Sequence, residues 1–216
     1  MPSTLVHVAI GGLVGAALLG DRFTPRAIAV VLVAAAIPDL DSVLTTFVGG
    51  AHRSALHTLL LPTVLAAGLY WDNQVSDRSW LGERFGPDAG YVAAVAVVGL
   101  AAGGILPDLF TNGVNAFWPL HDQFYTVNGE LLLSDQRGIV QTFVDLSPEK
   151  PASTTDNTRY STGADPKPWT EQEGPVERTF PVVTAGWQLM VVLLSTVSVG
   201  VRTWQVRRSD SLNSRR

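Results

Sequence analysis

Carboxylate and imidazole side chains gather in one short segment between two apolar stretches. The segment Ile37–Leu61 reads IPDLDSVLTTFVGGAHRSALHTLLL, and its polar residues are Asp39, Asp41, His52, Arg53 and His57. Ionisable groups beside apolar helices are costly to bury unless they pair with one another or with a metal ion. We therefore predict that this segment is half of a metal site at a membrane surface.

The ligand types define the chemistry that such a site could perform. The chain contains no Cys, so its metal ligands must be His and carboxylate side chains. Imidazole with carboxylate best fits Zn²⁺, and additional oxygen ligands would suit Mn²⁺ or Mg²⁺. Three protein ligands and one open position would lower the pKa of bound water toward ~7 and supply hydroxide for hydrolysis. Arg53 is placed to pair with an anionic substrate such as a phosphate.

The spacing of Asp39 and Asp41 leaves two interpretations open. Residues two apart point to different sides of a continuous helix. Either Pro38 breaks the helix at this point, or the two carboxylates have different roles, one as a ligand and the other as an orienter of a His.

The composition is that of a membrane protein. Hydrophobic residues make up 46% of the 216 residues and charged residues only 16%, against about a quarter charged in soluble domains. The mean hydropathy is +0.21. The net charge of −4 gives no reason to expect a nucleic-acid partner.

Several apolar stretches are near the ~20 residues that cross a bilayer. They are Thr4–Gly20, Thr24–Leu44, Ser54–Trp71, Ala89–Phe110 and Pro181–Trp204. Thr24 is a predicted N-cap, followed by Pro25 at the first helical position. We predict an all-α membrane protein, a bundle of about five transmembrane helices with a long extracytoplasmic loop containing a β-hairpin.

Loop charges predict the orientation in the cell membrane. The tail after Val201 holds five Arg and one Asp, whereas the loop 113–180 holds ten acidic and five basic residues. The positive-inside tendency places the tail in the cytoplasm and the loop outside. The predicted organisation is a four-helix region carrying the site (1–112), the acidic loop (113–180), a fifth helix (181–204) and a basic tail (205–216).

The acidic loop divides into two parts. Residues 123–133, QFYTVNGELLL, predict a hairpin around Asn128 and Gly129, a pair that tolerates positive φ. Residues 147–178 are rich in Pro, Ser, Thr and acidic residues and poor in large apolar ones. This composition predicts a flexible segment.

Alternating helix directions bring the polar residues to one face. The first, third and fifth predicted spans start, and the second and fourth end, at the same membrane surface. This surface is predicted to be the extracytoplasmic one. The groups that converge there are His7, Asp39, Asp41, His52, His57 and Asp108. We predict metal ligation by His7, Asp39, His57 and Asp108. Asp41 or His52 would act as base or orienter, and Arg53 would bind the anion.

These residues also carry a family resemblance. HxxxG at His7–Gly11, PDLD at Pro38–Asp41, HRSALHTLL at His52–Leu60, Asp108, and GVNAFWPL at Gly113–Leu120 resemble the YdjM-like membrane-bound metal-dependent hydrolase family. The resemblance covers residues 5 to 121, and its motif logic is similar to that of zinc-dependent phospholipase C and P1-type nucleases. It implies a polytopic membrane protein with a metal-dependent hydrolase site.

One position departs from the family pattern. The family has a His four residues before the Asp of the fourth helix, where this chain has Gly104. One metal ligand is therefore missing unless another group replaces it. His121, which follows Trp118-Pro119-Leu120, is the predicted candidate.

Two classes of function fit these observations. The first is a membrane-embedded hydrolase acting on an ester or phosphoester, with a lipid among the candidate substrates. The second is a non-catalytic membrane protein in which the His/Asp cluster is a structural or metal-binding network, and Gly104 favours it. A transporter fits less well, because its ionisable residues would lie near the bilayer midplane. Individually, His52 could be a solvated loop residue, Arg53 an interfacial anchor and Asp108 a helix cap.

Overall fold

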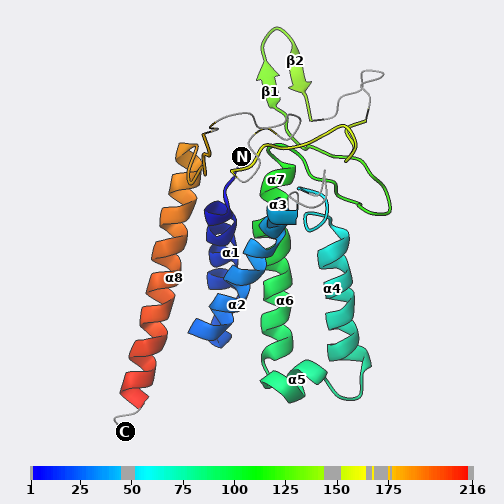
Figure 1. Cartoon of the computed structure of the whole chain (residues 1–216). Helices are drawn as coiled ribbons and strands as arrows, with labels where there is room; N and C mark the ends of the chain where they lie inside the picture. Colours follow the sequence, from blue (N-terminus) through cyan, green and yellow to red (C-terminus); the bar gives the residue numbers. More distant parts are fainter. Residues whose placement is uncertain are drawn as a thin grey trace.

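The computed structural model describes residues 2–44, 52–143, 152–163, 167, 175 and 177–213. The described chain is mostly helical, with one two-stranded antiparallel sheet. Long helices stand side by side in the bundle, and the short helix α5 and the C-terminus lie at one end (Figure 1). The N-terminus, the hairpin and the short helices α3 (Asp41–Leu44) and α7 (Leu106–Leu109) lie at the other end. That end carries the polar residues.

The first two helices follow the sequence prediction closely. Helix α1 spans Thr4–Leu18, and after a 3₁₀ turn at Gly20–Arg22 helix α2 spans Pro25–Ala36. The Thr24 hydroxyl accepts a hydrogen bond of 3.0 Å from the Ala27 amide, which confirms the predicted N-cap.

Helix α2 changes geometry where Pro38 was expected to break it. A 3₁₀ turn at Ile37–Leu40 leads into the short helix α3, Asp41–Leu44. Proline lacks the amide hydrogen that a regular helix needs in its interior. The turn places Asp39 and Asp41 on different partners.

The next helix, α4, spans Leu60–Tyr70 and so begins later than the predicted Ser54. The segment before it is held away from helical geometry by contacts with a distant loop. The Asn115 amide donates to the Arg53 carbonyl and the Leu59 amide to the Ala116 carbonyl, both at 2.8 Å. His57 therefore lies in a loop rather than within the helix.

The far end of α4 reverses the chain through a compact turn. A π-helical turn at Trp71–Val75 is followed by α5, Trp80–Phe85. The Asp72 carboxylate accepts hydrogen bonds from the backbone amide of Trp80 at 2.8 Å and from the Ser79 hydroxyl at 2.7 Å. These bonds cap the start of α5.

The fourth long helix contains an irregular centre. Helix α6 spans Ala89–Gly99, a π-helical stretch spans Leu100–Ile105, and α7 spans Leu106–Leu109. The stretch packs so closely on α1 that a Cβ at Gly103 would lie 2.9 Å from the His7 carbonyl oxygen. The sequence Pro-Asp-Leu occurs twice, at 38–40 in the turn after α2 and at 107–109 in α7, and the Asp of each lies beside His7.

Helix α8 spans Gly186–Asn213 and packs along α1 (Figure 1). The described residues hold three helices long and apolar enough to cross a membrane, namely Pro25–Leu44, Ala89–Leu109 and Gly186–Ser209. Helix α1 is apolar but shorter. The structure confirms a mostly helical protein with three candidate spans among the described residues. The predicted number of about five spans stays a prediction.

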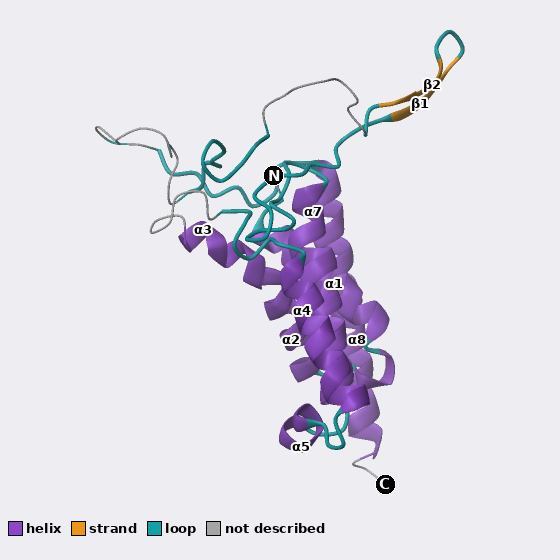
Figure 2. Cartoon of the chain, turned by 90° about the vertical axis from the view of Figure 1, so that its right-hand side faces the viewer, coloured by secondary structure: helices purple, strands orange, loops and turns teal. Residues whose placement is uncertain are grey.

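The hairpin was predicted at the wrong place. Strands β1, Leu131–Ser134, and β2, Gly138–Gln141, pair around residues 135–137 rather than around Asn128 and Gly129. Gly138 supplies the positive φ of +68° that the turn requires. The Ser134 hydroxyl accepts hydrogen bonds from two turn amides, at 3.2 and 3.1 Å. The hairpin projects away from the bundle (Figure 2).

Half of the predicted flexible segment 147–178 lies outside the described residues. Its part 152–163 is described and has defined local structure. Within it, the Thr158 amide donates to the Thr154 carbonyl at 2.9 Å, closing a turn. This part lies at the site end of the molecule.

The buried core lies in two layers. One layer packs α2 against α6 around Val31, which is fully buried. The second layer lies near the site and consists of Leu100, Ile105, Val114 and Ala116. An apolar layer of the core therefore lies next to the polar centre.

Candidate metal centre

The predicted residues meet in one buried cluster. Five of the six groups predicted to share one face are almost fully buried, and Asp39 retains 15% side-chain exposure. They come from α1, the turn after α2, α3, the loop before α4, and α7. Their roles as ligands or catalytic groups stay predictions, whereas their proximity is a property of the structure.

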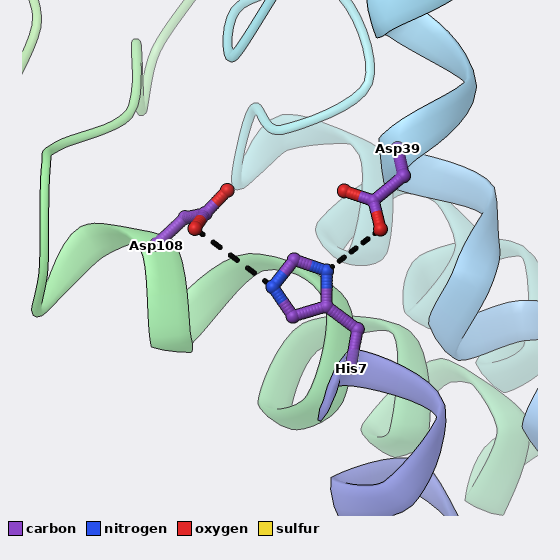
Figure 3. A group of neighbouring side chains, drawn as sticks. All are labelled: His7, Asp39 and Asp108. Carbon is purple, nitrogen blue, oxygen red and sulfur yellow. Dashed lines mark hydrogen bonds and ion pairs between the residues drawn. The ribbon is translucent and has the colours of Figure 1, made fainter. Parts of the chain in front are cut away.

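His7 lies between two carboxylates (Figure 3). Its Nδ1 donates to Asp39 Oδ2 at 3.0 Å, and its Nε2 lies 3.8 Å from Asp108 Oδ1. One ligand atom from each of these three residues lies within 4.8 Å of the other two. Such a group could hold a metal ion.

His57 reaches the same pair of carboxylates from the opposite side. Its Nε2 lies 3.2 Å from Asp108 Oδ2 and 3.8 Å from Asp39 Oδ1. All four predicted ligands are therefore assembled, because His7 and His57 both approach Asp39 and Asp108.

Asp41 uses both of its oxygens to hold neighbouring groups. Oδ1 accepts from His52 Nδ1 at 2.9 Å, and Oδ2 accepts from His57 Nδ1 at 2.8 Å and from the Arg53 amide at 2.9 Å. A carboxylate bound to Nδ1 fixes the tautomer and leaves Nε2 as the ligand atom. Of the two roles that the sequence left open for Asp41, the geometry favours the orienter.

The unsatisfied atoms of this cluster fit a cation. Within the described chain, five buried atoms of the centre have no hydrogen-bond partner: His7 Nε2, His52 Nε2, His57 Nε2, Arg53 Nε and Asp108 Oδ2. Buried polar atoms are normally paired, since leaving one unpaired costs about 1–3 kcal/mol. An ion held by His7, His57, Asp39 and Asp108 would satisfy three of the five.

The electrostatics of His57 also indicate that the cluster suits a cation. Burial alone lowers its pKa, but the carboxylates of Asp108 and Asp41 outweigh this effect and raise the pKa to about 9. The surroundings of this side chain therefore stabilise positive charge, which a divalent cation would also supply.

Arg53 is part of the centre and not a solvent-facing group. It is fully buried with a φ of +64°, and its Nη2 donates to Asp108 Oδ1 at 2.9 Å. Its guanidinium carbon lies 4.7 Å from the ring centre of Tyr160. Arg53 thus neutralises one oxygen of Asp108, and an aromatic ring covers it.

The structure explains the departure at Gly104 and corrects the predicted replacement. A Cβ at this position would lie 2.7 Å from both the Ala35 carbonyl oxygen and Pro38 Cγ, so there is no space for a side chain. His121 does not join the cluster, because its side chain is exposed and lies 3.2 Å from Gln123 Oε1.

Other residues of the site were missed by the sequence analysis. Asn115 is fully buried, and its Nδ2 donates to Asp122 Oδ1 at 2.5 Å. Tyr160 comes from the segment predicted to be flexible. Asn115 lies within the quoted GVNAFWPL motif, but the composition around Tyr160 gives no signal, since long-range contacts create its position.

Fold and site together define a helical membrane protein with a buried His/Asp centre at one end of its bundle. A family model described as YdjM inner membrane protein matches residues 1–206, and the chain belongs to this family. No curated protein and no solved structure matches the chain.

Proposed function

We propose that the protein is a membrane-embedded metal-dependent hydrolase acting on an ester or phosphoester. The observation that carries this proposal is the arrangement of His7 Nε2, His57 Nε2 and Asp108 Oδ2. All three are buried and none makes a hydrogen bond of good geometry among the described residues, and His57 Nε2 lies only 3.2 Å from Asp108 Oδ2. Metal hydrolases leave imidazole Nε2 atoms in this state when carboxylates hold the Nδ1 side.

The residues would divide the work. His7, His57, Asp39 and Asp108 would hold the ion, with Zn²⁺ the best fit to this donor set and Mn²⁺ or Mg²⁺ as alternatives. When bound, such an ion supplies an activated water and polarises the substrate. Asp41 orients His52 and His57 through their Nδ1 atoms.

The second group of residues would act on the substrate. His52 has an unpaired Nε2 beside the cluster and is placed to transfer a proton. The unused Nε of Arg53 would bind an anionic oxygen.

A groove beside the centre favours a lipid among the candidate substrates. A cavity of about 530 Å³ is lined mainly by apolar side chains from α1, the π-helical stretch, α7 and the residues after it, and α8. Its wall includes Ile10, which lies one turn along α1 from His7, and Pro107, the neighbour of Asp108. An acyl chain in this groove would bring its headgroup toward the centre.

The proposal extends to placement in the membrane. Five spans with the basic tail in the cytoplasm would put the centre and the loop 113–180 on the extracytoplasmic face of the cell membrane. The deciding experiment is elemental analysis of the purified protein and of His57→Ala, together with thermal unfolding before and after chelation. We expect stoichiometric metal in the wild type and a loss in the variant. Wild-type protein without metal, and with the same melting temperature after chelation, would refute the hydrolase.

The alternative is a non-catalytic protein in which the cluster is a structural or metal-binding network. Gly104 favours it, because the position of a family ligand is sterically closed here. His57→Ala separates the two functions: loss of hydrolysis with intact folding supports the enzyme, and loss of stability with no hydrolysis by the wild type supports the network.

A further inference from the structure

A short segment of the acidic loop crosses the centre. We call residues 152–163 the strap. The Phe124 amide donates to the Ser153 carbonyl at 2.8 Å, and the Thr155 hydroxyl donates to Asp122 Oδ2 at 2.6 Å. The Thr155 amide also donates to Asp122, at 3.1 Å. The strap is thus fastened at one end by side-chain and backbone bonds.

Near the other end of the strap, the Tyr160 side chain lies against the centre. The Tyr160 ring centre lies 4.7 Å from the guanidinium carbon of Arg53 and 6.1 Å from the ring centre of His52. Its hydroxyl donates to the Asn112 carbonyl at 3.0 Å. One aromatic side chain therefore covers the two residues proposed to meet the substrate.

The atoms beneath this ring are one donor, Arg53 Nε, and one acceptor, His52 Nε2, and neither has a hydrogen-bond partner within the described chain. Both residues are at most 3% exposed. A cation–π contact stabilises the guanidinium but satisfies none of its N–H groups. An anionic oxygen would satisfy Arg53 Nε, and a hydroxyl on the same phosphoryl group would donate to His52 Nε2, but only if Tyr160 moved away.

We propose that the strap is a closed cover over an anion subsite formed by Arg53 and His52, and that Tyr160 is the residue that must leave to admit a phosphoryl or carboxylate group. This inference rests on the proposed function for the identity of the reaction, and it adds how the substrate reaches the centre. The hydrogen bonds between Thr155 and Asp122 would hold the first part of the strap in place while Tyr160 moves.

The first test measures access to His52 in metal-free protein. Diethyl pyrocarbonate modifies imidazole nitrogens, and mass spectrometry reports each His separately, with the exposed His121 as an internal reference. We expect Tyr160→Ala to raise the rate at His52 about tenfold, and Tyr160→Phe to raise it less because only the bond to Asn112 is lost. Asp156→Ala, at an exposed strap position, is the matched control and should leave the rate unchanged.

The second test uses the absence of native Cys. Ser153→Cys with Phe124→Cys places two thiols at backbone-bonded positions, and the disulfide would lock the strap. We expect His52 to be protected in the oxidised protein and to regain its rate after reduction. Equal rates in the two states would overturn the cover even if Tyr160→Ala failed to fold.

Inorganic phosphate tests the anion subsite. In Tyr160→Ala, we expect phosphate to slow modification of His52 and to leave His121 unchanged. No protection by phosphate would overturn the subsite. These measurements need no metal, so the two proposals can fail separately. A protein that holds no ion but shows strap-dependent access to His52 would refute the hydrolase and support the cover. A protein that binds metal but whose His52 reacts equally with and without Tyr160 would support the hydrolase and refute the cover.

Discussion

At the residue scale, Asp41 shows how one buried carboxylate can hold several groups. It accepts hydrogen bonds from His52, His57 and the Arg53 amide while remaining fully buried. Asp41→Asn retains the volume but places a donor against an Nδ1–H group. We expect the affinity for Zn²⁺ to fall by about 10–100-fold, measured by calorimetric titration in detergent.

The matched control for this change is Asp88→Asn. Asp88 forms an exposed ion pair with Arg22 at the opposite end of the bundle. Its substitution should leave Zn²⁺ affinity unchanged. Equal loss of affinity in both variants would mean that Asp41 does not orient the ligands.

Arg53 provides a second prediction at this scale. Arg53→Met removes the Arg53–Asp108 ion pair and leaves the fully buried Asp108 side chain with only the His7 and His57 rings as partners among the described residues. Breaking a buried ion pair costs about 3–5 kcal/mol, and we expect a loss of this order in metal-free protein by denaturant unfolding. Arg22→Met removes an exposed pair and should cost about 0–1 kcal/mol. A similar small cost for both would show that Asp108 does not need its cation.

At the element scale, the packing of α2 on the π-helical stretch forbids a side chain at Gly104. We therefore expect Gly104→His to destabilise the protein by about 1–3 kcal/mol through overpacking, and not to add a metal ligand. Gly68→Ala is the control, since a Cβ at Gly68 in α4 meets nothing within 4 Å. Raised metal stoichiometry in Gly104→His at unchanged melting temperature would contradict this account.

The anchor of the strap should depend on pH. Burial raises the pKa of Asp122, but hydrogen bonds from Thr155 and Asn115 outweigh it and hold the pKa below the ordinary 3.8. Its stabilising contribution is therefore complete above the unfolded pKa and is lost as the pH falls through the lower folded value. We expect the difference in melting temperature between wild type and Asp122→Asn to be constant near neutral pH and to shrink below about pH 4. A difference in melting temperature that grows in acid would mean that the pKa of Asp122 is raised, and not lowered, in the folded protein.

The sequence could predict those features that depend on local rules. The Thr24 cap, the break at Pro38 and the shared face of His7, Asp39 and Asp108 follow from capping, proline geometry and alternating helix direction. The late start of α4 could not be predicted, because backbone bonds to a loop more than fifty residues away hold His57 outside the helix. The position of Tyr160 has the same long-range origin.

The hairpin error has a different cause. Asn-Gly is a strong local turn signal, but a competing turn at Gly138 also provides positive φ and has the Ser134 hydroxyl to bind its amides. Leu131, Leu132 and Leu133 were predicted to end the hairpin and instead form its first strand. Two valid local signals competed, and strand pairing decided between them.

At the scale of the whole molecule, the two ends of the bundle differ in chemistry, and this leads to a topology prediction. Single Cys residues can be introduced into a chain that has none. We expect Asp135→Cys, in the hairpin turn, to react with a membrane-impermeant maleimide in intact cells, and Asp77→Cys, before α5, to react only after lysis. The reverse pattern would place the centre on the cytoplasmic face.

The two Pro-Asp-Leu sequences have a consequence for how the centre comes into existence. Helices α1 and α2 supply His7 and Asp39, and the segment containing α4 and α6 supplies His57 and Asp108. Each half thus contributes one imidazole, His7 in the first turn of α1 or His57 in the loop before α4, and one carboxylate, Asp39 in the turn after α2 or Asp108 in α7. Neither half holds a complete ligand set, and each His contacts the Asp of the other half. The centre therefore lies at the interface between two halves that contribute the same ligand types. Any ion bound there would also stabilise the contact between these halves.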